Sequence, residues 1–178
     1  MPLSIEEHAA RAAVVVFDAD GVLTRGDIVY GPDGEWKAFN VQDGHGFDIA
    51  RRFGLKTAIV SGRASEALHR RAAELHVAVL EQGVKDKGAA VRGLAKKLGL
   101  ELEQVCYVGD DLPDLAVMKM VGFPVAVANA VDEVRKAALW VTQRRGGEGA
   151  AREVIEHVLK AKGVWPSVVQ HFTGSGDE

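Results

Sequence analysis

The sequence predicts an α/β protein built on a Rossmann-like, doubly wound and mainly parallel sheet. Short apolar runs alternate along the chain with segments of helical period, which is typical of right-handed strand–helix–strand units. Several of these runs are rich in valine and show no polar alternation, as expected for strands buried on both faces. The length of 178 residues suits one domain with a sizeable core.

Each apolar run is expected to be a strand, and each segment between two runs a helix. The predicted strands are residues 13–17, 57–60, 77–80, 105–108, 124–128 and 139–142. The predicted helices are residues 46–53, 65–75, 87–98, 113–120, 132–138 and 148–161. Gly54, Gly99 and Gly163 follow three of these helices, where a left-handed C-cap favours glycine.

Residues 26–40 break the alternation and are predicted to form a β-hairpin insertion. Pro32-Asp33-Gly34 supplies strong turn chemistry between two short extended runs. The hairpin carries more apolar side chains than a ribbon in water should, namely Ile28, Tyr30, Trp36 and Phe39. We expect residues 1–163 to form a single domain that includes the hairpin, and residues 164–178 to form a C-terminal tail that is frayed from residue 173.

Composition restricts the partners and the compartment. Lys plus Arg number 22 and Asp plus Glu number 25, so nothing in the charge suggests a nucleic-acid partner. The single cysteine, Cys106, cannot form an intramolecular disulfide and suits a reducing cytoplasm. No apolar run approaches the roughly 20 residues of a membrane span, and the N-terminus lacks the features of a signal peptide. We therefore expect a cytoplasmic protein with no membrane partner.

Two clusters of carboxylates follow predicted strands. Asp18 and Asp20 come directly after the first strand, and ligands of open parallel sheets bind at this end of the strands. A plain polar turn is the alternative there. Asp110, Asp111 and Asp114 follow the fourth strand, and the preference of helix N-termini for acid accounts for only one or two of them. Together with Asp18 they form an oxygen-rich set that suits Mg²⁺.

Two smaller polar groups follow the neighbouring strands. Ser61-Gly62-Arg63 offers a hydroxyl and a cation, although the same residues also form common turns. Lys87 begins a helix, where its charge opposes the helix dipole unless an anion lies nearby. All four groups should converge at one sheet edge. A carboxylate nucleophile, an acid–base carboxylate, a cationic clamp and a divalent ion together favour phosphoryl transfer.

In this order, Asp18-x-Asp20, Ser61, Lys87 and Gly109-Asp110-Asp111-x-x-Asp114 resemble the four motifs of the haloacid dehalogenase superfamily. The resemblance implies that Asp18 is the nucleophile that becomes an aspartyl-phosphate. It implies that Asp20 protonates the leaving oxygen and then activates water, and that Ser61 and Lys87 hold the phosphoryl oxygens. Mg²⁺ would lie between the Asp18 carboxylate, the Asp20 carbonyl and Asp110, with Asp111 or Asp114 in support.

A narrower resemblance covers residues 14–163. The segments that carry it are 20–24, 37–40, 43–46, 61–63, 82–83, 117–118 and 146–154, and they resemble the 3-deoxy-D-manno-octulosonate 8-phosphate phosphatase group. Ala19 departs from the usual Val of that group. The resemblance implies Mg²⁺-dependent hydrolysis of this sugar phosphate in lipopolysaccharide precursor synthesis. Two alternatives remain open: a nine-carbon 3-deoxy-ulosonate 9-phosphate phosphatase, and a non-catalytic oligomerisation module.

The spacing of the motifs leaves no room for a cap domain. Only a hairpin and a helix fit between Asp20 and Ser61, so the site of one subunit should be open to water, which phosphoryl transfer does not favour. We expect a neighbouring subunit to cover it with the hairpin or the glycine-rich loop 144–149, and the resemblance implies a homotetramer. Arg63 should point toward the organic part of the substrate and grip a carboxylate there, with Arg152 of a neighbouring subunit as a second basic contact.

Overall fold

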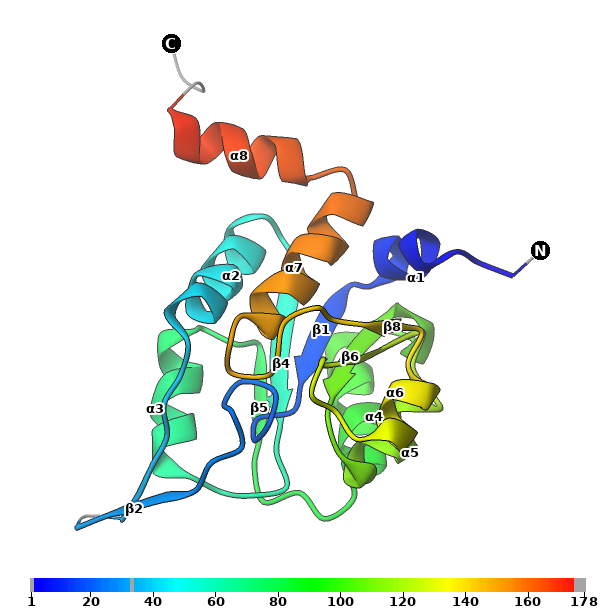
Figure 1. Cartoon of the computed structure of the whole chain (residues 1–178). Coiled ribbons are helices and arrows are strands. Elements are labelled where there is room, and N and C mark those ends of the chain that lie inside the picture. Colours follow the sequence, from blue (N-terminus) through cyan, green and yellow to red (C-terminus); the bar gives the residue numbers. More distant parts are fainter. Residues whose placement is uncertain (1, 33, 175–178) are drawn as a thin grey trace.

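Six parallel strands form the central sheet of the computed structural model, which describes residues 2–32 and 34–174. In spatial order the strands are β5 (Val79–Glu81), β4 (Lys56–Val60), β1 (Val14–Phe17), β6 (Val105–Gly109), β7 (Phe123–Ala126) and β8 (Trp140–Val141) (Figure 1). The chain runs outward from β1 to β4 and β5, then crosses to β6 and runs outward again. The order therefore reverses between β1 and β6, where open α/β sheets bind their ligands.

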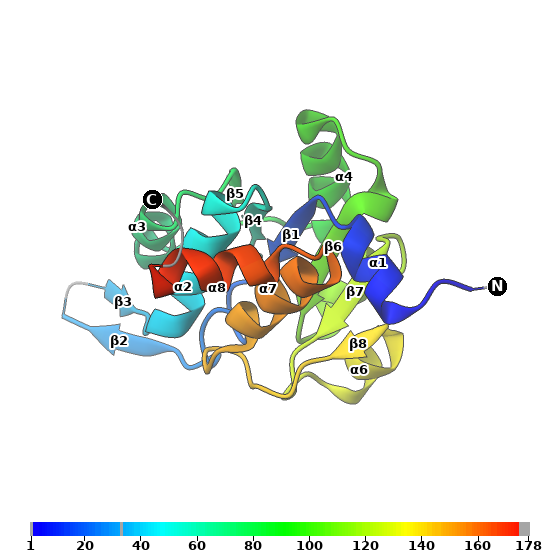
Figure 2. The same cartoon turned by 90° about the horizontal axis from the view of Figure 1, so that it is seen from above.

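Helices cover both faces of this sheet, as the doubly wound prediction requires. They are α1 (Ile5–Arg11), α2 (Val41–Arg52), α3 (Glu66–Glu74), α4 (Lys87–Leu98), α5 (Leu115–Met118), α6 (Asp132–Ala137), α7 (Ala150–Ala161) and α8 (Trp165–Thr173), with 3₁₀ turns η1 (Leu102–Gln104) and η2 (Leu112–Asp114). Helix α7 packs against α1 and α2, whereas α5 packs against α4 and α6. Figure 2 shows α7 and α4 on opposite sides of β1 and β6.

The core lies between β1 and the helices on each face. All four residues of β1 are buried, which explains its unbroken apolar run. Phe17 at its end meets Phe47 of α2 with ring centroids 5.0 Å apart, so the strand that leads into the site is held by α2. Cys106 is buried inside β6, where it acts as a small core residue.

Helix α2 begins five residues earlier than the sequence pattern predicts. Asn40 caps it by accepting hydrogen bonds from the amides of Gln42 and Asp43. Two glycines in its first half, Gly44 and Gly46, weaken the helical pattern of the sequence. Tertiary contacts stabilise this part of the helix instead. A Cβ at Gly44 would lie only 2.2 Å from Nη2 of Arg71 on α3, so the glycine permits this close approach.

Two further helices were absent from the prediction. Helix α1 begins with a capping box in which Ser4 and Glu7 exchange hydrogen bonds. Helix α8 lies within the segment predicted to be a tail, has Pro166 in its first turn and buries Val168. The prediction of a frayed end is wrong for Thr173, which ends α8, and residues 175–178 lie outside the described residues.

The predicted hairpin is present and stands away from the central sheet (Figure 1). Its antiparallel strands β2 (Val29–Gly31) and β3 (Gly34–Trp36) are shorter than expected and pair Tyr30 opposite Glu35. Tyr30 is 80% exposed and Trp36 is 57% exposed, so this apolar surface has no cover within the described chain. Among the described residues, no helix has the length and apolar character needed to cross a bilayer.

Candidate active site

The four polar groups converge where β1, β4, β5 and β6 end. Asp18 directly follows β1, Ser61 follows β4, and Asp110 follows β6, while Lys87 is the first residue of α4. They share a cavity of about 500 Å³. Its lining residues are Asp18, Asp20, Ser61, Gly62, Arg63, Val84, Lys85, Asp86, Lys87, Asp110, Asp111, Pro113 and Ala116. The sequence-predicted residues are thus brought together, except that Asp114 lies fully buried beneath the cavity.

Lys87 is buried between two carboxylates. Its Nζ lies 2.9 Å from Asp18 Oδ1 and 2.7 Å from Asp114 Oδ1. Burial alone would lower the pKa of Lys87, but the two carboxylates outweigh burial and raise this pKa. The lysine is therefore a permanent cation next to Asp18. Its position at the start of a helix, unfavourable in isolation, is explained by these two anions.

Asp114 organises the cluster from below. Oδ1 accepts hydrogen bonds from Lys87 and from the Tyr107 hydroxyl at 2.6 Å, and Oδ2 accepts from the amides of Asp110 and Asp111 at 2.9 and 3.2 Å. Its side chain thus fixes the loop after β6. Asp111 itself is exposed, and its carboxylate accepts a hydrogen bond from the Leu112 amide at 2.8 Å. A role for Asp111 in metal binding stays a prediction.

The carboxylates of Asp18, Asp110 and Asp114 suit a divalent cation. One oxygen of each lies within 4.8 Å of the others. Burial, followed by the neighbouring negative charges, raises the pKa of Asp110 to about 8. Burial and the Asp114 charge raise the pKa of Asp18 to about 6, against the opposing effect of Lys87. Asp110 Oδ1 is buried without a hydrogen-bond partner, which is the environment a hard cation would complete.

Gly21 shapes the wall of the carboxylate cluster. It follows Asp20, has a φ of +89° and lies against Asp110, whose Oδ2 would be only 1.9 Å from a Cβ at this position. A side chain here would collide with the carboxylate and strain the backbone. The glycine of the first motif is therefore needed for Asp110 to approach the turn that carries Asp20.

The turn after β4 presents a hydroxyl to the cavity. Ser61 is 1% exposed, and its backbone is tied on both sides, to the Glu81 carbonyl and to the Val84 amide. Its Oγ accepts a hydrogen bond from the Arg63 amide at 3.3 Å. Because an accepting hydroxyl can still donate its own proton, Ser61 can hold an anionic oxygen in the cavity.

Two hairpin residues, Lys37 and Glu35, contact residues of the site. Lys37 lies in one of the segments that carry the resemblance, but the sequence pattern assigns a role to neither residue. The Lys37 ammonium forms an ion pair with Asp20 and lies 3.0 Å from Glu35 Oε1. The other Glu35 oxygen pairs with the Arg63 guanidinium. Alternation along β3 could not reveal these contacts, because they depend on how the hairpin folds back toward the sheet.

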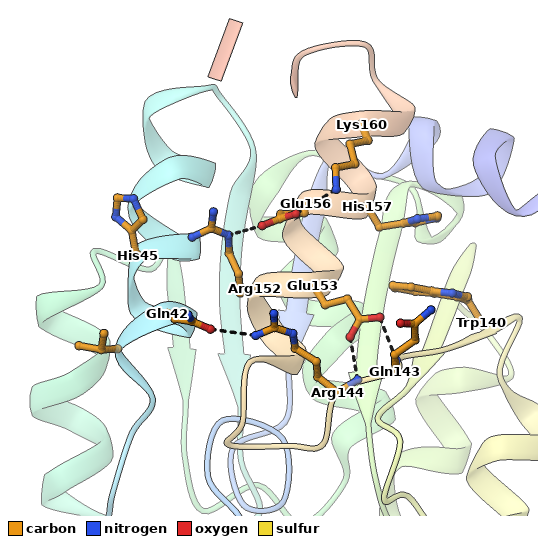
Figure 3. A pocket seen from close by; sticks show the side chains of 11 residues that line it. Gln42, His45, Trp140, Gln143, Arg144, Arg152, Glu153, Glu156, His157 and Lys160 are labelled. Atoms are coloured by element: carbon orange, nitrogen blue, oxygen red, sulfur yellow. Dashed lines mark hydrogen bonds and ion pairs between the residues drawn. The ribbon is translucent and has the colours of Figure 1, made fainter. Parts of the chain in front are cut away.

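The glycine-rich loop 144–149 packs against its own chain. The Gly147 amide donates to the Val22 carbonyl at 2.9 Å, and Glu148 pairs with Arg25 at 3.3 Å. The loop therefore braces the turn after Asp20 in the same subunit, and the expectation that it also covers a neighbouring site stays a prediction. Figure 3 shows how the start of the loop is held, with Arg144 contacting Gln42 and the Glu153 carboxylate.

A second cavity, of about 660 Å³, lies between α2, α7 and the segment before the loop (Figure 3). Within it, Arg152 and Lys160 both pair with Glu156, at 2.7 and 2.9 Å. Arg152 also lies 5.8 Å from the Trp165 ring. Its guanidinium is thus engaged within its own chain, in a cavity that shares no lining residue with the carboxylate cluster.

A capless Rossmann-like domain with an Asp-x-Asp turn, a buried lysine and an acidic loop at its switch point is a phosphohydrolase of the haloacid dehalogenase class. A family model for haloacid dehalogenase-like hydrolases matches residues 72–154. The chain is 42% identical over 156 residues, 87% of its length and 83% of the relative's, to the 3-deoxy-D-manno-octulosonate 8-phosphate phosphatase KdsC of Escherichia coli K12. The chain belongs to this phosphatase family.

Solved structures agree with this assignment. The phosphatase of the same name from Moraxella catarrhalis, in complex with magnesium, phosphate and KDO, has a TM-score of 0.92 at 41% identity, covering 94% of this chain and 97% of the other. A cobalt-bound form from Haemophilus influenzae has a TM-score of 0.85 at 37% identity, covering 88% and 92%. Both are similar to this chain over nearly its whole length.

Proposed function

We propose that this protein hydrolyses 3-deoxy-D-manno-octulosonate 8-phosphate to the free sugar acid and phosphate with the help of Mg²⁺. The observation that carries the proposal is the buried Lys87 shared by Asp18 and Asp114, next to a carboxylate, Asp110, that has an unpartnered buried oxygen. The similar phosphatase from Moraxella catarrhalis binds magnesium, phosphate and KDO. The reaction would serve lipopolysaccharide precursor synthesis in the cytoplasm.

The first chemical step uses Asp18 as nucleophile. A carboxylate oxygen of Asp18 forms a bond to phosphorus while the bond from phosphorus to the sugar oxygen breaks. Lys87 keeps Asp18 charged and, together with the Ser61 hydroxyl, holds the negative oxygens of the phosphoryl group. Asp20 gives its proton to the departing sugar oxygen, which would otherwise leave as a poorly stabilised alkoxide.

The second step returns Asp18 to its starting state. Asp20, now ionised, takes a proton from a water molecule that attacks phosphorus, and phosphate leaves Asp18. When bound, Mg²⁺ supplies positive charge that offsets the repulsion between Asp18 and the phosphoryl oxygens. Asp18 and Asp110, with the Asp20 carbonyl, are the residues that would hold it, and Asp114 orients them from below.

Arg63 is the residue proposed to read the carboxylate of the sugar acid. It follows Ser61 at the mouth of the cavity, where its side chain is 42% exposed, and it already binds one carboxylate, that of Glu35. A planar guanidinium suits a carboxylate because it can donate two parallel hydrogen bonds. Gly62, which separates Arg63 from Ser61, lines the same cavity and lets a substrate approach the backbone.

The hairpin supports the proposal of a homotetramer. Exposed apolar side chains crowd its two strands and the start of α2, and burying them against other copies would gain about 25 cal/mol per Å². They are Ile28, Val29, Tyr30, Trp36 and Val41. The same hairpin carries Lys37, which pairs with Asp20 of the site, so an assembly through the hairpin would bring neighbouring subunits close to the site and limit access of water to it.

Phosphate release from a panel of sugar phosphates, with and without Mg²⁺, tests the proposed function. The wild-type protein should prefer the eight-carbon acid, chelation should abolish turnover, and Asp18→Asn should be inactive while keeping its fold. A preference for the nine-carbon acid would favour the alternative sugar. An Asp18→Asn protein with near-normal turnover would exclude the aspartyl-phosphate route. The intact set of Asp18, Asp20, Lys87 and Asp110 argues against a non-catalytic module, because a purely structural role would not require all four charged groups at one sheet edge.

A further inference from the structure

The hairpin carries one charged side chain that is buried against Asp20, a residue that lines the catalytic cavity. Tyr30 and Trp36 on the same hairpin are largely exposed, but the Lys37 side chain is only 3% exposed. A buried ammonium is costly unless it is paired, and Lys37 is paired twice, with Asp20 and with Glu35 at 3.0 Å. Lys37 is thus the hairpin side chain that links the hairpin to Asp20.

The Asp20 side chain is less enclosed than the Asp18 side chain. The Asp20 side chain is 26% exposed, whereas that of Asp18 is 9% exposed and lies beside Lys87. The side-chain hydrogen bond that the structure gives Asp20 comes from Lys37, through Oδ1. An ammonium bound to one oxygen of a carboxylate limits the rotation of the carboxylate group. The second oxygen is then held in one orientation.

Proton transfer requires that the free oxygen of Asp20 is held in a fixed orientation. Asp20 has to face the departing sugar oxygen in the first step and the attacking water in the second, and misplacement by about an ångström can cost about a hundredfold in rate. Building on the proposed function, we propose that Lys37 is a positioning residue that orients Asp20 for proton transfer. The hairpin would then contribute to catalysis in its own subunit, besides its surface for other copies.

Glu35 connects this contact to the substrate end of the cavity. Its two oxygens bind Lys37 and Arg63, so four charged side chains of alternating sign run from Asp20 to Arg63. When a substrate carboxylate reaches Arg63, Glu35 keeps Lys37 as its partner, and Lys37 keeps Asp20. Glu35 therefore gives Lys37 a second ion-pair partner that does not depend on the bound ligand.

The dependence of the rate on the leaving group separates positioning of Asp20 from mere support of the hairpin. A sugar oxygen needs a proton as it leaves, but p-nitrophenolate does not. Lys37→Met should lower kcat/KM for the sugar phosphate by about a hundredfold and for p-nitrophenyl phosphate by less than about fivefold. Lys37→Arg, which keeps a cation at Asp20, should restore much of the loss, and Lys37→Gln is a second neutral variant if Lys37→Met does not fold.

Control measurements make the outcome decisive. Ile28→Lys, at a 50% exposed hairpin position outside the β2–β3 pairing, should affect both esters equally. Mg²⁺ affinity measured by calorimetry should be the same in Lys37→Met as in the wild type. Equal losses on both esters in a folded Lys37→Met protein would overturn the proposal, since the lysine would then act only through the hairpin. A wild-type protein that hydrolyses neither ester would instead refute the proposed function, and this inference with it.

Discussion

Lys87 Nζ lies 2.9 Å from Asp18 Oδ1, and this buried contact joins the nucleophile to the rest of the site. The same ammonium lies 2.7 Å from Asp114, so a single cation serves two carboxylates that face each other. Since charges buried in a protein interact more strongly than charges in water, this residue matters for both stability and chemistry.

Replacing Lys87 by Met should therefore destabilise the protein as well as inactivate it. Met keeps the length of the side chain but leaves Asp18 and Asp114 without their cation, and breaking a buried pair costs about 3–5 kcal/mol. Urea unfolding in the presence of a chelator measures the change in the free energy of unfolding. Lys97→Met, at an exposed position of the same helix, is the matched control. Equal effects of the two substitutions would show that the buried contact contributes little.

Stability of the metal-free protein should fall as pH rises. Burial and neighbouring charges raise the pKa of Asp18 to about 6 and that of Asp110 to about 8, above their value in an unfolded chain. A raised carboxyl pKa contributes stability that is fully present below the ordinary value and is lost as pH rises through the raised one. The loss should thus occur between about pH 4 and about pH 8.

Mg²⁺ should reverse this loss, because a divalent cation favours the ionised carboxylates. The increase in Tm on adding Mg²⁺ to chelator-treated protein should be larger near pH 8 than near pH 5. Asp110→Asn removes the group that titrates highest, so its Tm should change less with pH and respond less to Mg²⁺. A Tm increase that is independent of pH in both proteins would contradict the account of the carboxylate cluster.

Much of the site could be predicted from the sequence because its residues follow buried strands. A run such as Val14–Phe17 ends where polarity begins, so Asp18, Ser61, Lys87 and Asp110 could each be placed at the same sheet edge. Lys37 could not be placed in this way. Its contact with Asp20 spans 17 residues and depends on the path of a hairpin that pairs only with itself.

The segments missed in the fold have local explanations. Helix α2 carries Gly44 and Gly46 in its first turns, which lower helix propensity, and the packing against Arg71 and α7 compensates for them. Helix α8 follows Gly163, whose φ of +72° is typical of a helix C-cap. The polar residues 173–178 at the end of the sequence indicate a frayed tail rather than a further helix. Its burial of Val168 comes from tertiary contact, which apolar periodicity over nine residues indicates only weakly.

Charge on the hairpin surface should dissociate the proposed tetramer. Tyr30→Lys places an ammonium on an apolar face and opposite Glu35, a pairing that leaves the hairpin itself intact. Light scattering should report about four chains for the wild type and a smaller mass for the variant. Leu139→Lys, at an apolar position that is 44% exposed and off the hairpin, should leave the mass unchanged. A wild type that is monomeric and fully active would exclude a role for neighbouring subunits.

Arg63→Ala should lower kcat/KM for the sugar acid phosphate far more than for glucose 6-phosphate, which has no carboxylate. A charge-assisted hydrogen bond contributes about 1.5–3 kcal/mol, or about ten- to a hundredfold in specificity. Arg63→Lys should recover only part of this loss, since an ammonium lacks the planar fork. Arg70→Ala, at an exposed cation on α3, is the control.

If Arg63 only ties its loop to Glu35, kcat/KM should fall by the same factor for acidic and neutral substrates. Measured with saturating Mg²⁺ and unchanged mass, equal losses would rule out reading of the substrate carboxylate by this residue.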